Sequence, residues 1–290
     1  MIIGHPAFLL HAAGVRKRYS AGVRFFQGVN RSLFDQGFIF SGFTFLARVG
    51  EQANYSDEKP QITPSILRKS LRCKVKRNPL WAEAILRSYA RNICQLTEVK
   101  SIYKDAKTET NMAESTFFDY LEALQKLYIL EDVEAWCPSI RSKTAIRSAR
   151  KKNFVDPSLA VAAMGVGPAY FDKDYRTLGF LFESLVIRDL RIYSSEHGGR
   201  VSYYHDRYGL EADAVLHLED GRYALIEVKL GQSEIEDGAR HLCEIERLIA
   251  EHNKDEKQVP LRLPDLKIVI TGTKYGYVRP DGVYVIPIGC

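Results

Sequence analysis

The sequence predicts an α/β protein, α+β overall, in which a helical domain with a hairpin precedes a mixed sheet flanked by helices. Two observations carry this prediction. Apolar residues recur at helical spacing over residues 79–128, and from residue 177 the predicted order is helix, three strands, helix and two strands. With 290 residues, 46% of them hydrophobic, the chain is long enough to form two packed domains.

Three helices are expected in the first half of the chain. Pro79 can open the first helix. Its apolar stripe is Trp81, Ile85, Tyr89 and Ile93. A shorter helix fits residues 98–106, and Asn111-Met-Ala-Glu114 resembles a capping box that would open a third. The third stripe is Phe117, Leu121, Leu124 and Tyr128.

A hairpin with a basic tip should follow these helices. Residues 129–136 and 153–157 read as its two strands, and three helices before a hairpin is the order of a winged helix. The third helix is acidic, so any DNA contact should use the tip instead. The basic residues expected there are Arg141, Lys143, Arg147, Arg150, Lys151 and Lys152. Two alternatives are a solvated loop and a winged helix used only for packing or protein contacts.

Composition excludes several classes of protein. Residues 1–50 contain six Lys or Arg and one acid, which accounts for the net charge of +5. No run of about twenty apolar residues occurs, so no membrane span is expected. Five scattered cysteines without a Cys-x-x-Cys pair argue against a zinc site or a disulfide framework and fit a cytoplasmic protein. Gly37–Gly42 has phosphate-loop spacing but lacks the following Lys, so independent ATP hydrolysis is not expected.

The chain divides into four expected segments. Residues 1–60 show no clear period and stay unassigned, residues 61–157 form the winged-helix-like domain, and residues 158–176 suit a linker. Residues 177–290 form the second domain. Its predicted helices run over 177–196 and 233–252, the second opened by a capping box at Ser233-Glu-Ile-Glu236. Its predicted strands are 200–205, 211–218, 222–230, 266–271 and 282–288.

The candidate site lies on the second and third of these strands. Alternate residues of a strand share a face, so Glu227 and Lys229 point the same way. Asp213 joins them only if the connecting loop has three residues, Glu219-Asp220-Gly221, since a two-residue loop would pair Asp213 with Val228. We predict the three-residue loop with Gly221 in the left-handed conformation. An ordinary solvated strand face is the competing interpretation.

Glu183 adds a fourth group from the helix before the sheet. Its neighbours three and four residues away are all glycine or apolar, so we expect it to be buried. A buried carboxylate needs a partner, and a metal ion or Lys229 could serve. A structural salt bridge is the alternative.

These residues together resemble the PD-(D/E)XK nuclease superfamily. More closely, residues 79–290 resemble a domain of unknown function of the DUF4143 type, which usually follows an AAA+-type ATPase domain. The matching stretches are Leu86-Arg-Ser-Tyr-Ala-Arg-Asn92, Phe154-Val-Asp-Pro-Ser-Leu-Ala160, Gly179-Phe-Leu-Phe-Glu-Ser-Leu-Val186, Gly209-Leu-Glu-Ala-Asp-Ala214 and Ile226-Glu-Val-Lys-Leu-Gly231. We expect the ATPase half to be missing here, because residues 1–60 are too short for it and contain no phosphate loop.

The resemblance implies roles for the site residues. Asp213 and Glu227 would bind Mg²⁺ or Mn²⁺, with Glu183 supporting the metal and Glu211 as an additional ligand. Lys229 would orient the attacking water or stabilise charge on the phosphate. Such hard oxygen ligands suit these ions.

Two functional hypotheses follow. The first is a DNA-associated protein with a metal-dependent phosphodiesterase site, favoured by the intact set of four residues. The second is a non-catalytic DNA- or protein-interaction module, including one that forms homo-oligomers, favoured because no basic groove is evident beside the site. A third, a degenerate remnant of an ATPase system without activity, is weaker.

Overall fold

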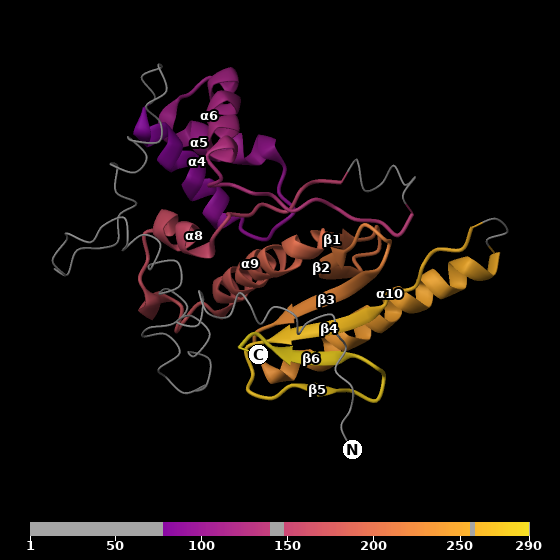
Figure 1. The fold of residues 1–290 in the computed structure, drawn as a ribbon. Coiled ribbons are helices and arrows are strands. Elements are labelled where there is room, and N and C mark those ends of the chain that lie inside the picture. The colour runs from indigo at the N-terminus through magenta and orange to yellow at the C-terminus, as the bar shows by residue number, and fades with distance from the viewer. Residues whose placement is uncertain (1–77, 140–147, 256–258, 290) are drawn as a thin grey trace.

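The computed structural model describes residues 78–139, 148–255 and 259–289. Residues 1–77 lie outside this part of the chain, as do three of the predicted DNA contacts, Arg141, Lys143 and Arg147. The described residues form a helical region, residues 78–171, and a sheet region, residues 175–289, as Figure 1 shows. No helix in these residues is long and apolar enough to span a bilayer.

The helical region begins with α4 (Pro79–Arg91), α5 (Val99–Thr110) and α6 (Glu114–Lys126). The Asn78 side chain caps α4 by accepting a hydrogen bond from the Leu80 N–H at 3.1 Å. The predicted stripes of α4 and α6 are confirmed, apart from Trp81, which is half-buried, and Tyr128. Tyr128 is 77% exposed because α6 ends before it.

The predicted capping box at Asn111 is wrong. Asn111 ends α5 in the left-handed conformation, with φ of 54°, and its N–H donates to the Lys107 carbonyl at 3.0 Å. Asparagine is one of the few residues that tolerate this conformation. Ala113 occupies the N-cap of α6 and makes no side-chain capping bond.

Two extended segments follow the helices and pair as the predicted hairpin requires. Val133 and Lys151 exchange backbone hydrogen bonds of 2.9 and 3.0 Å. On its other side, the returning segment pairs with the residues after α4, since the Lys152 carbonyl accepts from Cys94 at 2.7 Å. The segment around Lys151 is therefore held along both edges.

Much of the predicted linker is packed. Residues 157–164 form α8 (Pro157–Met164), capped by Asp156, and a short 3₁₀ helix η2 (Pro168–Tyr170) follows. Ala160 and Phe171 are buried in the same apolar cluster as the helical region. The four segment limits themselves stay a prediction.

The sheet region contains six strands in a mixed sheet of order β1-β2-β3-β4-β6-β5. The strands are β1 (Arg200–His205), β2 (Glu211–His217), β3 (Tyr223–Lys229), β4 (Leu266–Thr271), β5 (Tyr277–Val278) and β6 (Tyr284–Pro287). β1, β2 and β3 are antiparallel, while β3, β4 and β6 are parallel. The mixed sheet was predicted, whereas the short edge strand β5 was not.

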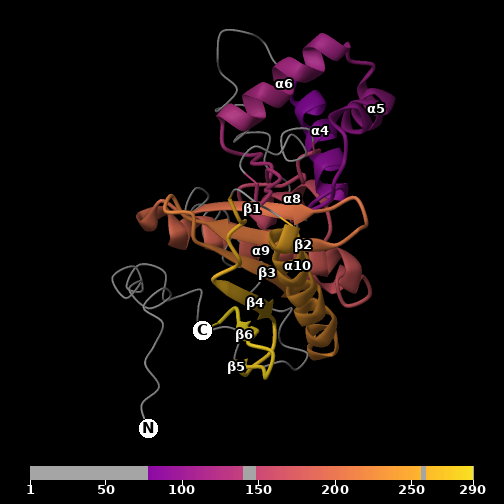
Figure 2. The same cartoon turned by 90° about the vertical axis from the view of Figure 1, so that its right-hand side faces the viewer.

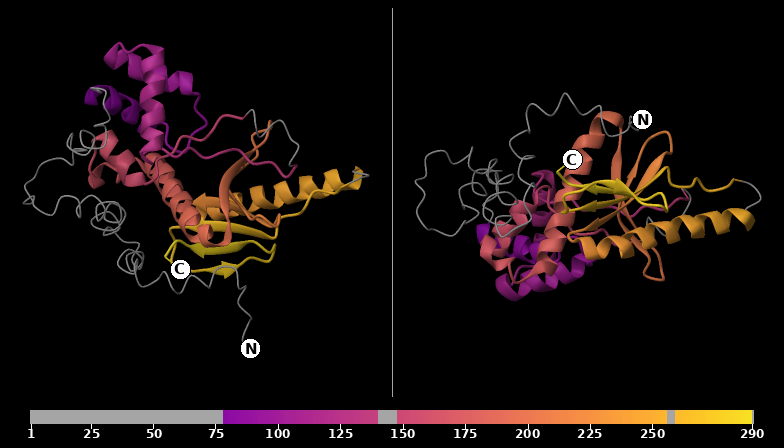
Figure 3. Two further views of the ribbon diagram at one scale, coloured as in Figure 1. Left: turned by 45° about the horizontal axis from the view of Figure 1, so that its top comes forward. Right: turned by 90° about the horizontal axis from the view of Figure 1, so that it is seen from below.

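Two long helices cover the sheet, one on each face (Figure 3). α9 (Tyr175–Ser194) packs its Phe182 into the cluster that contains Ile226 and Val228. α10 (Ile235–Asp255) packs its Leu242 with Tyr223 and Leu225. Short 3₁₀ helices, η3 (Ser195–His197) and η4 (Gln232–Glu234), lie beside them. The predicted cap at Ser233 is wrong, since Ser233 lies inside η4 and the N-cap is Gly231, whose N–H donates to Glu234.

The sheet continues into the helical region. Tyr203 donates its backbone N–H to the Glu134 carbonyl at 3.0 Å, and its own carbonyl accepts from Trp136 at 2.7 Å. Residues 134–136 therefore extend the sheet beyond β1 and cover an edge that would otherwise be open. Figure 2 shows α4 to α6 at the β1 end of the molecule and β5 at the opposite end.

The loop between β2 and β3 has the predicted three residues. The Leu218 N–H donates to the Arg222 carbonyl at 2.9 Å, and Gly221 has φ of 86°. The ladder then runs from His217↔Tyr223 to Ala214↔Ile226. The next position in this register is that of Asp213 and Glu227.

Replacing Gly221 by alanine tests this turn. Nothing lies within 4 Å of a Cβ built there, so the cost comes from the left-handed backbone alone. G221A should lower the free energy of unfolding by about 1 kcal/mol. G179A is the matched control, because Gly179 lies in α9 with equally open space and a helical backbone. It should raise stability by roughly 0.5–1 kcal/mol. Urea denaturation measures both, and an unchanged G221A would contradict the turn.

Candidate functional site

The predicted site begins at the end of β3. Glu227 is fully buried, and its Oε2 lies 2.5 Å from Lys229 Nζ. The same ammonium lies 3.7 Å from Asp213 Oδ2. The predicted loop therefore brings Asp213, Glu227 and Lys229 together, as the register requires.

Asp213 lies at an irregularity in β2. The register against β1 shifts between the pairs Ser202↔Val215 and Tyr204↔Ala212, so Asp213 and Ala214 together oppose one residue. The Asp213 carboxylate accepts a hydrogen bond from the Val228 N–H at 2.8 Å. This hydrogen bond satisfies the Val228 N–H of β3 and holds the Asp213 side chain in place.

Glu183 reaches the site from α9 and is buried, as expected. Its partner is Lys151, whose Nζ lies 2.8 Å from Glu183 Oε1. Lys151 Nζ also lies 3.8 Å from Asp213 Oδ1. Asp213 therefore stands between two ion pairs, Lys151–Glu183 and Lys229–Glu227. Sequence reasoning proposed Lys229 or a metal for Glu183 and missed Lys151.

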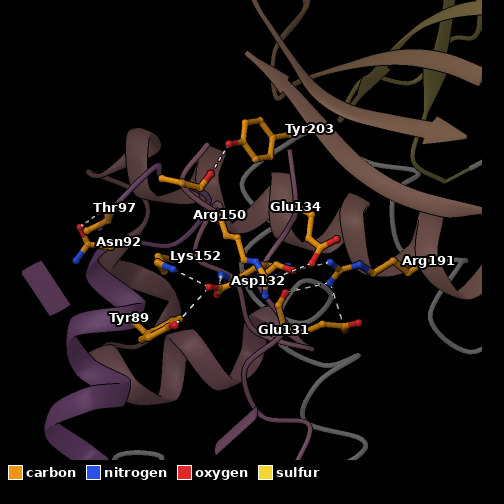
Figure 4. A network of polar contacts seen from close by, with 12 residues as sticks. Tyr89, Asn92, Thr97, Glu131, Asp132, Glu134, Arg150, Lys152, Arg191 and Tyr203 are labelled. Carbon is orange, nitrogen blue, oxygen red and sulfur yellow. Dashed lines mark hydrogen bonds and ion pairs between the residues drawn. The ribbon is translucent and has the colours of Figure 1, made fainter. Parts of the chain in front are cut away.

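Lys151 and Lys152 do not lie on an exposed basic tip, which corrects their assignment as DNA contacts. They are 3% and 2% exposed. Successive residues of an extended segment point to opposite sides. Lys151 accordingly meets Glu183, whereas Lys152 Nζ meets Asp132 Oδ2 at 2.6 Å (Figure 4). Arg150 is exposed and pairs with Glu134 at 2.8 Å.

Further contacts fasten the two regions beside the site. Arg191 of α9 donates to the carbonyls of Glu131 and Asp132, both at 3.1 Å, as Figure 4 shows. The Tyr203 hydroxyl donates to the Ala149 carbonyl. The ring of Tyr203 lies 5.6 Å from Lys151 Nζ, within cation–π range.

Helix α10 supplies a residue that sequence reasoning missed. His241 Nδ1 lies 3.4 Å from Glu227 Oε1, and its side chain is 38% exposed. One turn earlier, a Cβ on Gly238 would come within 3.3 Å of Lys229. The spacing of Gly238 and His241 was the signal in the sequence that could have indicated this residue. Residues three apart on a helix lie on the same face, and here both lie beside Glu227.

Burial and neighbouring charge shift the protonation of these groups. Burial, then the Asp213 charge, raises the pKa of Glu227 to about 9. Burial raises the pKa of Glu183 to about 7, against the opposing effect of Lys151. Burial alone would raise the pKa of Asp213, but Lys151, Lys229 and the Val228 N–H hold it below its ordinary value. Asp213 is therefore the carboxylate that stays ionised.

Glu211 lies at the start of β2, where it pairs with His205. It is half-buried, and its charge adds to the field that raises the pKa of Glu183. Among the described residues, Asp213 and not Glu211 contacts the two lysines.

The arrangement does not fit a divalent cation. Across the described ranges, no three His, Cys, Asp or Glu side chains are grouped to hold one. Carboxylates are the right ligands for Mg²⁺. Here, however, Lys151 and Lys229 contact Glu183, Asp213 and Glu227. Glu227 Oε2 accepts no hydrogen bond from the described residues, although it lies 2.5 Å from Lys229 Nζ.

The raised pKa of Glu227 predicts a pH-dependent stability. Between its ordinary value of 4.5 and about 9, the folded protein binds this proton and the unfolded chain does not. The free energy of unfolding should therefore fall as pH rises through that window. E227Q removes the titration, so it should gain at least about 1 kcal/mol over wild type from pH 5 to pH 9.

Urea denaturation across this pH range measures the difference. E114Q is the control, because Glu114 is exposed on α6, and its stability should stay parallel to that of wild type. Parallel curves for E227Q and wild type would show that Glu227 titrates at its ordinary value.

Two family models match the chain, and the boundary between the two matches separates Lys151 from Glu183, which form an ion pair. Residues 178–290 match the model of a domain of unknown function, DUF4143, and residues 51–170 match that of another, DUF8612. No curated protein matches the chain. Glu183, Asp213 and Glu227 lie in the first match and Lys151 in the second. The C-terminal part of the chain, residues 178–290, is therefore similar to DUF4143 domains.

Proposed function

We propose that this protein is a non-catalytic interaction module with a PD-(D/E)XK nuclease-type fold, derived from an AAA+-type ATPase family and associated with DNA. The site residues stabilise the junction between the two regions. The helical region, which we propose to be a winged helix, supplies the binding surface.

One observation carries the non-catalytic role. Lys151 Nζ lies 2.8 Å from Glu183 and 3.8 Å from Asp213, in a cluster where all three groups are buried. A nuclease of the expected kind needs these carboxylates free to bind a metal and a water. In this structure Glu183 and Asp213 are instead buried in contact with the Lys151 ammonium.

The DNA-binding role rests on the order of elements and on charge. Three helices precede the paired segments, as in a winged helix. Glu114, Asp119 and Glu122 make α6 a poor reader of DNA, so the tip between the paired segments is the better candidate. Arg150 is the exposed member of the basic set within the described residues.

A divalent-metal-dependent phosphodiesterase is the second candidate. The supporting observation is that Asp213, Glu227 and Lys229 meet as the resemblance requires, with the Lys229 side chain 21% exposed. In such an enzyme Mg²⁺ or Mn²⁺ would supply electrophilic and water-activating chemistry. The paired lysines favour the first candidate.

DNA binding tests the first proposal. The variant R141E/K143E/R147E should weaken binding of the full chain to duplex DNA and reduce the slope of log K against log salt by about 2 to 3. Fluorescence anisotropy over a salt series measures both. K100E/K104E/K107E is the matched control, since it reverses three exposed charges on α5 and should change the slope less.

Cleavage assays separate the two candidates. Wild type with Mg²⁺ or Mn²⁺ should leave supercoiled, linear and branched DNA intact. Cleavage that both D213A and K229A abolish would establish the enzyme and refute the non-catalytic role.

In the anisotropy experiment, equal DNA binding by both triple variants would refute the assignment of the tip to DNA.

A further inference from the structure

We propose that the ammonium of Lys151 takes the place of a divalent cation in the DUF4143 domain, so that the helical region keeps the carboxylate site closed to metal. The inference deepens the proposed non-catalytic role and rests on it. It concerns Lys151, a residue that the sequence analysis did not place at the metal site.

Geometry places the charge where a cation would be needed. Lys151 Nζ contacts Glu183 Oε1 at 2.8 Å and lies 3.8 Å from Asp213 Oδ1. These two carboxylates come from different elements, α9 and β2. The Lys151 ammonium therefore places a positive charge between the two carboxylates, where a bound cation would also lie.

Lys229 does not make Lys151 redundant. Its Nζ is 2.5 Å from Glu227 and 3.7 Å from Asp213, so its closest contact is on the α10 side. Within the described residues, the salt bridge of Glu183 is to Lys151. Without Lys151, Glu183 and Asp213 would need another cation or a proton.

The backbone gives Lys151 little freedom to leave. Its N–H and carbonyl both bond to Val133, and Lys152 is anchored to Asp132 on the opposite side. The Tyr203 ring lies beside the Lys151 ammonium. Removing the ammonium therefore requires either a substitution or separation of the paired segments.

Mn²⁺ binding to substituted proteins tests the inference. K151M removes the ammonium and keeps a long apolar stem. We expect K151M to bind Mn²⁺ at least about 100-fold more tightly than wild type in calorimetry. Its melting temperature should rise by roughly 5 °C in saturating Mn²⁺. Wild type should show no rise.

Two further variants separate charge from shape. K151R retains the cation and should bind no more Mn²⁺ than wild type. K151M/D213N lacks the carboxylate between the two pairs and should lose the binding gained by K151M. Wild type that binds Mn²⁺ as tightly as K151M would overturn the inference, and so would a folded K151M that fails to bind.

A folding defect in K151M would also be informative. Refolding of K151M by Mn²⁺, followed by circular dichroism, would support the inference. If K151M stays unfolded in Mn²⁺ while K151M/E183Q folds without metal, the site does not accept the ion and the inference fails. Mn²⁺ binding is measured without DNA, so its failure and a failure of the DNA-binding role are distinguishable.

Discussion

The contact of the Lys151 ammonium with Glu183, beside Asp213, is the interaction on which the arrangement of the two regions depends. Each of these groups is expensive to bury alone, because its charge would lose water without gaining a partner. Together they compensate one another, and the Lys151–Glu183 pair joins the helical region to α9. Removing one partner of a buried pair typically costs about 3–5 kcal/mol, whereas an exposed pair contributes little.

The backbone reinforces the same junction. Residues 134–136 extend the sheet at β1, and Arg191 donates to two carbonyls of the neighbouring segment. Backbone hydrogen bonds at this edge fix the position of the segment that carries Lys151. The predicted site thus lies where two stretches that match different family models meet, which explains why its carboxylates are buried and paired.

Local patterns predicted the parts of the structure that local forces decide. The alternation along β3 and the turn at Gly221 correctly placed Asp213 beside Glu227, because a pleated strand and its loop set the register. Apolar spacing predicted α4 and α6. Asn111 was misread because the same residue suits a helix start and a left-handed helix end. The two-residue strand β5 was too short to leave a periodic signal.

The sequence by itself determined the strand register and the burial of Glu183, since each follows from neighbours within a few residues. The set of carboxylates was indicated by the resemblance to the DUF4143 type. Only the tertiary structure decided that Lys151 is the partner of Glu183. Adjacent basic residues are typical of a solvated tip, and composition cannot distinguish that from an extended segment with carboxylates on both sides. The pairing depends on residues 32 positions apart in the chain, brought together by packing of α9 against the helical region.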